Sequence, residues 1–220
     1  MWKPFVQVAC IIFFLFPRFS LAQSETDSLH YRKVYVTSGM GWGFALGRTS
    51  DVLQAKFSNS LGLDISLAKE GFFLYPSLDF LVFRYNQQEG DSDYPYDLDR
   101  GRSNFYILNL AGGVRKQIGR LNTYAFAGPG AGVIAEPRAA VSEATRNVSI
   151  ETTSYLTPTL RGGVGADYRI GGFFLFVEAG WLHNFRSVQQ RPVNVLSLYG
   201  GLKTDITKLK DNVASVIGLD

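Results

Sequence analysis

Apolar and polar residues alternate along most of the chain after residue 33. In the stretch VYVTSGMGWGFALG, which begins at Val34, bulky residues hold most even positions, and glycine and other small residues hold most odd ones. A period of two is the pattern of a β-strand with two different faces. We expect eight strands, at about residues 34–47, 57–68, 72–86, 104–118, 122–136, 155–169, 173–187 and 194–206.

Prolines interrupt the alternation in two of these strands. Pro76 cannot donate a backbone hydrogen bond to a neighbouring strand, so we expect a bulge or a local break there. The sequence Gly-Pro-Gly at residues 128–130 makes the register of the strand at 122–136 the least well defined.

The connections between the predicted strands alternate in length. Those after the second, fourth and sixth strands are two to four residues long. Two of the others are longer and polar, at about residues 87–103 and 142–154. No helical pattern lies between the strands, and this layout is typical of an antiparallel up-and-down β-barrel.

A glycine-rich hairpin at residues 160–181 indicates which face of the strands points inward. If Gly171 and Gly172 form a two-residue turn, Ile170 lies opposite Phe173. One face of the hairpin is then uncharged. The opposite face carries all four charged residues of the hairpin, which are Arg161, Asp167, Arg169 and Glu178.

Charged residues of other strands, Asp64, Asp79, Arg115 and Lys203, fall on the same small, polar face. An Arg or Lys side chain that faced lipid at mid-depth would cost about 2–4 kcal/mol, whereas one that faces a lumen can pair or meet water. We therefore predict an all-β protein, an eight-stranded antiparallel up-and-down transmembrane β-barrel with its apolar face outward. A soluble barrel that holds an apolar ligand would show the reverse arrangement.

The charged residues are predicted to form a network inside the barrel. Eight strands leave an interior that side chains just fill, so we expect a plugged polar lumen and not a wide pore. Salt bridges that fix the strand register are favoured over a gated proton or ion path, because the signs balance. The predicted network consists of Asp64, Asp79, Arg115, Arg161, Asp167, Arg169, Glu178 and Lys203.

Aromatic residues gather near the predicted strand ends, as they do in the interfacial girdles of membrane barrels. On the side of the long loops these residues are Trp42, Phe57, Tyr85, Phe105, Tyr106, Tyr155 and Phe185. On the side of the short turns they are Phe72, Tyr124, Tyr168 and Phe173.

The first 22 residues have the pattern of a secretory signal peptide. Lys3 precedes the apolar run 5–16, and the small residues before Gln23 suit cleavage there. A membrane-spanning helix is the alternative, but it would need about 20 apolar residues. Cleavage removes two of the 22 Lys and Arg residues, which leaves 20 against 19 acidic ones, a net charge of +1 that does not indicate nucleic-acid binding.

Cleavage would also remove Cys10, the one cysteine of the chain, so cysteine catalysis, disulfides and Cys-ligated zinc are excluded for the mature protein. Residues 23–33 are predicted to be a polar periplasmic linker. Residues 207–220 form a C-terminal tail with helix-like apolar spacing.

Candidate chemistry is sparse. His183 and Ser187 share a strand face, but no acid lies near them in sequence on that face, so we expect no enzyme activity and no cofactor. Asp91, Asp93, Asp97 and Asp99 could offer oxygen ligands to calcium, yet their spacing is not that of a defined calcium loop. A solvated acidic loop is the favoured interpretation.

The runs GFFLYPSLDFLVFRY and GGVGADYRIGGFFLFVEAGW, which follow a Sec-type signal, resemble the PorT-like outer-membrane β-barrel proteins of Bacteroidota. The resemblance covers about residues 34–206, and its motifs carry no catalytic residue. It implies an eight-stranded barrel in the outer membrane of a Gram-negative bacterium, and the founding member is linked to a protein-secretion system. The tail at 207–220 departs from the usual ending on an aromatic residue of the last strand.

The predicted function is that of a monomeric outer-membrane barrel in contact with outer-membrane lipid, a structural and interaction module without nucleic-acid partners. Its protein partners would meet the loops around residues 88–103 and 142–154, with both termini in the periplasm. The alternative is an accessory component of a protein-secretion or envelope complex that docks through the periplasmic turns and the tail. A lipid-modifying enzyme is a third class, with His183 as its test residue.

Overall fold

The computed structural model describes residues 33–67, 71–88, 98, 100–142 and 147–207. The predicted signal peptide and tail, apart from Thr207, lie outside these ranges, as do Asp91, Asp93, Asp97 and Asp99. Nine strands and one short 3₁₀ helix make up the described part of the chain. They are β1 (Val34–Ala45), η1 (Gly47–Asp51), β2 (Leu53–Ala55), β3 (Phe57–Ser66), β4 (Phe72–Tyr85), β5 (Gly101–Ile118), β6 (Leu121–Ser142), β7 (Asn147–Ile170), β8 (Phe173–Val188) and β9 (Arg191–Asp205).

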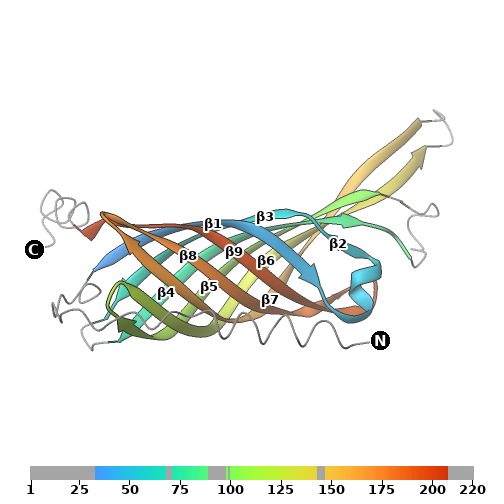
Figure 1. The fold of residues 1–220 in the computed structure, drawn as a ribbon. Helices are drawn as coiled ribbons and strands as arrows, with labels where there is room; N and C mark the ends of the chain where they lie inside the picture. The colour runs from blue at the N-terminus through green and yellow to red at the C-terminus, as the bar shows by residue number, and fades with distance from the viewer. Residues whose placement is uncertain (1–32, 68–70, 89–97, 99, 143–146, 208–220) are drawn as a thin grey trace, which may run out of the picture.

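The strands close into an antiparallel barrel. From β3 to β9 each strand pairs with the next one in sequence, and β1 pairs with both β3 and β9. β2 and β3 pair with successive parts of β4 and together act as one strand of the barrel. The nine strands therefore form an eight-stranded barrel. Figure 1 shows the tilted strands from the side. The predicted all-β fold, an eight-stranded antiparallel up-and-down barrel, is confirmed.

One extra residue separates β2 from β3. Ala55 pairs with Phe83, but Asn59 pairs with Phe80, so the register along β4 shifts by one residue around Lys56. The hydroxyl of Ser58 accepts a hydrogen bond from the backbone N–H of Val82 at 3.1 Å, which supplies a partner at the interruption. The sequence did not predict β2, because three residues are too few to show a period.

Pro76 leaves the register unchanged. It lies opposite Leu110 in a ladder with β5 that continues through it. On the side of β3 the paired positions stop at Ser77 and resume at Leu74 in the same register. The expected bulge is absent, but the expected local break is present on the edge toward β3, where proline has no N–H to donate. The Gly-Pro-Gly sequence at 128–130 also lies within one continuous strand, β6.

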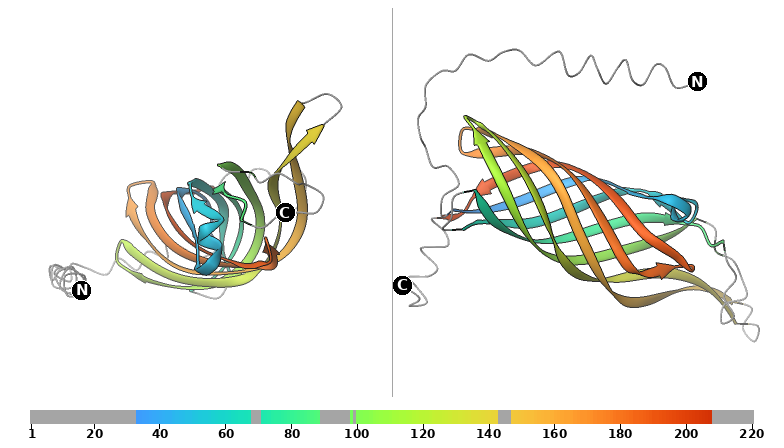
Figure 2. Two further views of the ribbon diagram at one scale, coloured as in Figure 1. Left: turned by 90° about the vertical axis from the view of Figure 1, so that its right-hand side faces the viewer. Right: turned by 90° about the horizontal axis from the view of Figure 1, so that it is seen from below.

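The polar loop predicted at residues 142–154 is also wrong, because the chain forms a hairpin there. β6 runs to Ser142 and β7 begins at Asn147, with Glu136 opposite Thr153. Neither β5 nor β8 pairs with this part of the hairpin. We call residues 136–142 and 147–153 the arm. It projects from the end of the barrel away from the described ends of the chain, as Figures 1 and 2 show.

The two faces of the strands differ as the alternation predicts. Outward side chains are apolar and exposed, with Leu108 63% and Val177 64% exposed, and inward ones are buried. The hairpin of β7 and β8 has the predicted register, with Ile170 opposite Phe173 and Gly165 opposite Glu178. No helix in the described ranges is long and apolar enough to cross a membrane.

Inward glycines leave space for aromatic rings. A Cβ atom at Gly165 would lie 2.4 Å from the ring of Tyr124, and one at Gly113 would lie 2.3 Å from the ring of Phe73. Both distances are far below van der Waals contact. The barrel can therefore hold these two rings only because the neighbouring strands carry no side chain at these positions.

Candidate functional site

The interior of the barrel contains two groups of paired charges. The first lies toward the short turns, and Asp64 is its centre. The guanidinium of Arg115 donates to both carboxylate oxygens of Asp64, at 2.9 and 2.5 Å. Lys203 lies between two acids, with its Nζ 2.5 Å from Asp64 and 2.9 Å from Asp167. The amide of Asn122 also donates to Asp167, at 3.1 Å.

The second group lies near the middle of the strands and is built around Arg161. This residue is 2% exposed. Its guanidinium contacts Glu178 at 2.7 Å and Asp79 at 3.1 Å, and donates to the hydroxyl of Ser77 at 2.5 Å. Asn109 donates to Asp79 at 2.8 Å. A fully buried guanidinium is thus surrounded by two carboxylates, as a charge in an apolar barrel requires.

Aromatic rings fill the space between these charges. The guanidinium of Arg115 lies over the ring of Phe73 at 4.2 Å, and that of Arg161 lies over Phe126 at 5.2 Å. Lys203 lies 4.9 Å from the ring of Tyr35. Ring faces attract cations, so these contacts both fill volume and stabilise the buried bases.

Seven of the eight predicted network residues belong to these two groups; Arg169 does not. Arg169 lies at the end of β7, where its Nε donates to the carbonyl of Gly171 in the turn at 3.2 Å. This bond is exposed. Alternation places Arg169 on the correct face but carries no information about depth along the axis.

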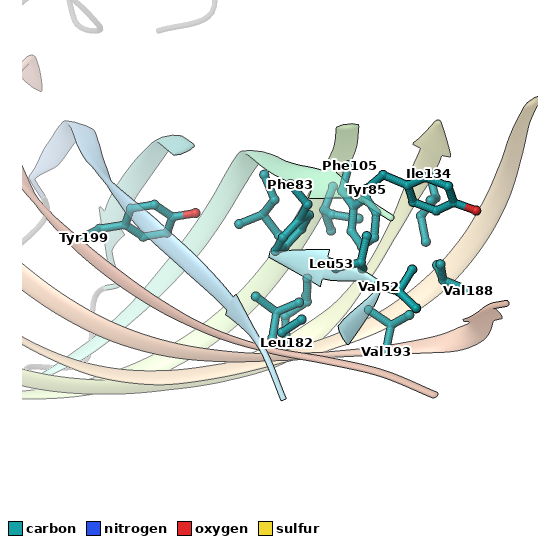
Figure 3. Close-up of a cluster of buried hydrophobic side chains, with 14 of the residues drawn as sticks. Val52, Leu53, Phe83, Tyr85, Phe105, Ile134, Leu182, Val188, Val193 and Tyr199 are labelled. Carbon is teal, nitrogen blue, oxygen red and sulfur yellow. The ribbon is translucent and has the colours of Figure 1, made fainter. Parts of the chain in front are cut away.

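Toward the long loops the interior also contains a large apolar cluster, which the prediction of a plugged polar lumen did not include. Figure 3 shows the side chains that pack there. Val52 and Leu53, which follow η1, insert among residues from β4, β5, β6, β8 and β9. The cluster consists of Ala45, Val52, Leu53, Leu81, Phe83, Tyr85, Phe105, Ile107, Ile134, Phe176, Leu182, Val188, Val193, Val195 and Tyr199.

A third polar cluster, which the sequence analysis missed, closes the interior where the arm begins. Glu136 is 1% exposed and accepts hydrogen bonds from the hydroxyls of Tyr155 and Tyr85. Arg138 donates to Glu136 at 2.9 Å and to the Tyr85 hydroxyl at 2.6 Å. Gln189, from the turn between β8 and β9, also donates to Tyr85, at 2.6 Å. The cluster fastens the base of the arm to the barrel.

This cluster lies beyond the apolar belt, because the outward residues at its level, Arg84 and Arg102, are charged. Burial, followed by the negative charge of Glu136, raises the pKa of the Tyr85 phenol to about 12. The same two causes raise the pKa of Tyr155. Both hydroxyls therefore keep their protons and donate at neutral pH. Alternation along β6 could have predicted that Glu136 points into the barrel, since it lies on the same face of the strand as Ile134 and Tyr124.

His183 points outward and has the surroundings of an interfacial side chain. Its Nδ1 lies 2.8 Å from the amide oxygen of Asn194. Its ring lies between those of Trp181 and Phe185, at 5.9 and 4.8 Å. These partners are an amide and two aromatic rings, and they provide neither the nucleophile nor the orienting acid that a catalytic histidine needs.

No protein-family model matches the sequence, and no curated protein matches it. Several solved outer-membrane proteins have a similar fold. Neisserial surface protein A is 13% identical, with 78% of this chain and 96% of that chain covered and a TM-score of 0.47. Ail, the attachment invasion locus protein of Yersinia pestis, is also 13% identical, with 78% and 96% covered and a TM-score of 0.39. The N-terminal β-barrel domain of Pseudomonas aeruginosa OprF is 12% identical, with 79% and 98% covered and a TM-score of 0.39.

Proposed function

We propose that the chain is a transmembrane barrel of the bacterial outer membrane that serves as a structural and interaction module. The observation that carries the proposal is the distribution of side chains across the wall of the barrel. Paired charges and a packed apolar cluster occupy the inside, and large apolar residues are exposed outside. A soluble barrel would expose this apolar surface to water, whereas lipid would cover it.

The outward aromatic residues support a membrane position with two interfaces. Trp42, Phe57, Tyr106, Trp181 and Phe185 are exposed toward one end. Phe72, Tyr168 and Phe173 are exposed toward the other. Four residues that were expected in these girdles point into the barrel instead. Tyr85 and Tyr155 donate to Glu136, Phe105 packs in the apolar cluster and Tyr124 donates to Glu178.

The positions of the loops support one orientation. The two ends of the barrel sheet meet at the short-turn end, where the N–H of Val34 donates to the hydroxyl of Thr207 at 3.0 Å. Outer-membrane barrels have short turns in the periplasm and longer connections outside the cell. In this orientation η1 and the arm face the extracellular medium. We also propose membership of the PorT-like family, on the two motifs quoted above.

The arm is the part of the molecule that supports an interaction role. Its outward face exposes Val148 and Ile150, each 66% exposed. Exposed apolar side chains on a projecting hairpin suit contact with another molecule. The alternative role in a secretion complex depends on residues 208–220, which lie outside the described ranges, and stays a prediction.

Cysteine labelling in cells tests the proposal, because the mature chain would have no thiol of its own. Val148→Cys in the arm should react with a membrane-impermeant maleimide in intact cells. Arg120→Cys, in the turn between β5 and β6, should react only after the outer membrane is permeabilised. Val177→Cys, on the exposed outer wall, should react only after the barrel is unfolded. Rapid labelling of Val177→Cys in the native protein would show that the outer wall faces water and would refute the proposal.

A further inference from the structure

A pocket of about 360 Å³ lies on the outer wall of the barrel, at the end that we place outside the cell. It lies where the end of β1, η1, β8 and the start of β9 meet. Ligand sites in proteins are commonly concave and of this size or larger. The pocket is lined by Leu46, Gly47, Arg48, Thr49, Trp181, Pro192 and Asn194.

Hydrogen bonds hold the walls of the pocket together. The N–H of Leu46 donates to the carbonyl of Asn194 at 2.8 Å. The hydroxyl of Thr49 donates to the carbonyl of Pro192, also at 2.8 Å. Arg191 donates to the carbonyl of Arg48 at 2.8 Å. Because these bonds join η1 to β9, the pocket is preformed, and a ligand would not need to order the loop on binding.

The lining has an apolar part and a cationic part. Leu46 and Trp181 are each 40% exposed and provide an apolar wall, and the Trp181 ring is stacked with that of His183. Arg48 also lines the pocket, is exposed, and is its basic residue. Arg191 lies beside it and is 3.8 Å from the exposed carboxylate of Asp51. Two bases and one acid at the rim leave a local excess of positive charge.

The apolar wall continues into the belt that we assign to lipid. Phe44 lies opposite Leu196 on β9, and Leu196 lies opposite Trp181 on β8, so these three outward residues form a row across neighbouring strands that begins at the pocket residue Trp181. An acyl chain that leaves the pocket along this row stays on apolar surface. A soluble anion would make no use of that surface, whereas a lipid with an anionic headgroup would use both parts.

We propose that this pocket binds a phosphorylated glycolipid of the outer leaflet. Arg48 contacts a phosphate group, and Trp181 and Leu46 contact the first part of an acyl chain. Guanidinium groups recognise phosphate through charge-assisted hydrogen bonds, and tryptophan is suited to the interface between headgroups and acyl chains. The inference rests on the proposed outer-membrane location, because only there does the pocket open into a lipid leaflet.

Native mass spectrometry of the purified full-length mature barrel in detergent tests the pocket, with diphosphoryl lipid A as the probe. Arg48→Ala should weaken lipid A binding about tenfold or more, as expected for the loss of one charge-assisted hydrogen bond. Trp181→Ala should also weaken it, by a smaller factor. The matched control is Arg102→Ala on β5, on the opposite side of the ring at the same end, where the exposed Arg102 bonds Asn104. This control should bind lipid A within about twofold of the parent.

Three results would overturn the proposal. One is equal lipid A affinity of the Arg48→Ala and Arg102→Ala proteins. Another is binding of phosphatidylethanolamine as tight as that of lipid A. The third is tight binding of inorganic phosphate alone, which would make the pocket a soluble-anion site. Each protein is first tested for a heat-dependent gel shift, which reports a closed barrel. A normal shift without lipid A binding would refute the pocket and leave the proposed location standing.

Discussion

Removal of the Arg161 side-chain charge should be the most damaging single change inside the barrel. Arg161→Met keeps most of the volume but leaves Glu178 and Asp79, at 2.7 and 3.1 Å from the guanidinium, without their shared base. Loss of one partner from a buried ion pair typically costs about 3–5 kcal/mol. Because two carboxylates lose their partner here, we expect a cost at the upper end of that range, about 4–5 kcal/mol. Arg161→Lys should cost less, since it keeps the charge but cannot contact both acids as a fork does.

The assay is urea unfolding of the barrel in lipid vesicles, followed by the fluorescence of Trp42 and Trp181. Arg169→Met is the matched control, because Arg169 lies at the turn end of β7, where its bond to the Gly171 carbonyl is exposed, and its replacement should cost at most about 0.5 kcal/mol. The double variant Arg161→Met with Glu178→Gln should recover part of the loss, since a neutral pair leaves less buried charge unpaired. If Arg161→Met unfolds within about 0.5 kcal/mol of the parent, the interior charges are not paired as described.

Three further predictions concern Tyr85, two turns of the barrel and the arm. Between about pH 10 and pH 12 the folded state keeps the Tyr85 proton, whereas the unfolded chain releases it, so the free energy of unfolding falls as the pH rises. The midpoint temperature of the gel shift should therefore fall less over this pH range in Tyr85→Phe than in the parent protein. An equal fall in both proteins would contradict this. Glycine adopts a positive φ more easily than other residues. Gln190 has a φ of 57°, so Gln190→Gly should raise the free energy of unfolding in urea by roughly 0.5–1 kcal/mol. Gly171 has a φ of 60°, so Gly171→Ala should lower it. Replacement of residues 138–151 by a two-residue Asn-Gly turn should leave the heat-dependent gel shift intact but abolish cross-linking to any extracellular partner; unchanged cross-linking would exclude the arm as the contact surface.

The sequence could predict the faces of the strands and the register of one hairpin, because both follow from local alternation and from turn chemistry. It could not pair the charges. Lys203 contacts Asp64 across the junction of β9, β1 and β3, and such contacts depend on how the sheet closes. Alternation also carries no information about depth, which is why Arg169 was expected inside the network although it lies at the rim.

Three features at the arm end of the barrel were missed by the sequence analysis, each for a different reason. The arm is built from residues such as Thr152 and Thr153, whose polarity suggests a loop although threonine favours extended backbone. β2 is too short for a periodic signal, and Val52 and Leu53 reveal their role only once they insert among distant side chains. Glu136 was expected at the end of a predicted strand. Its burial depends on Arg138, from the arm, and on Tyr155, from the base of the arm.

The mobility of the membrane-extracted protein on a gel, with and without boiling in SDS, tests the central claim most directly. A closed transmembrane barrel with its charges paired inside should stay folded in SDS until it is heated, so the unheated band should migrate differently from the boiled one. The same shift should persist in Arg169→Met and should need less heat in Arg161→Met. A protein released in soluble form by osmotic shock, with one band at all temperatures, would contradict the claim that its apolar outer wall lies in a membrane.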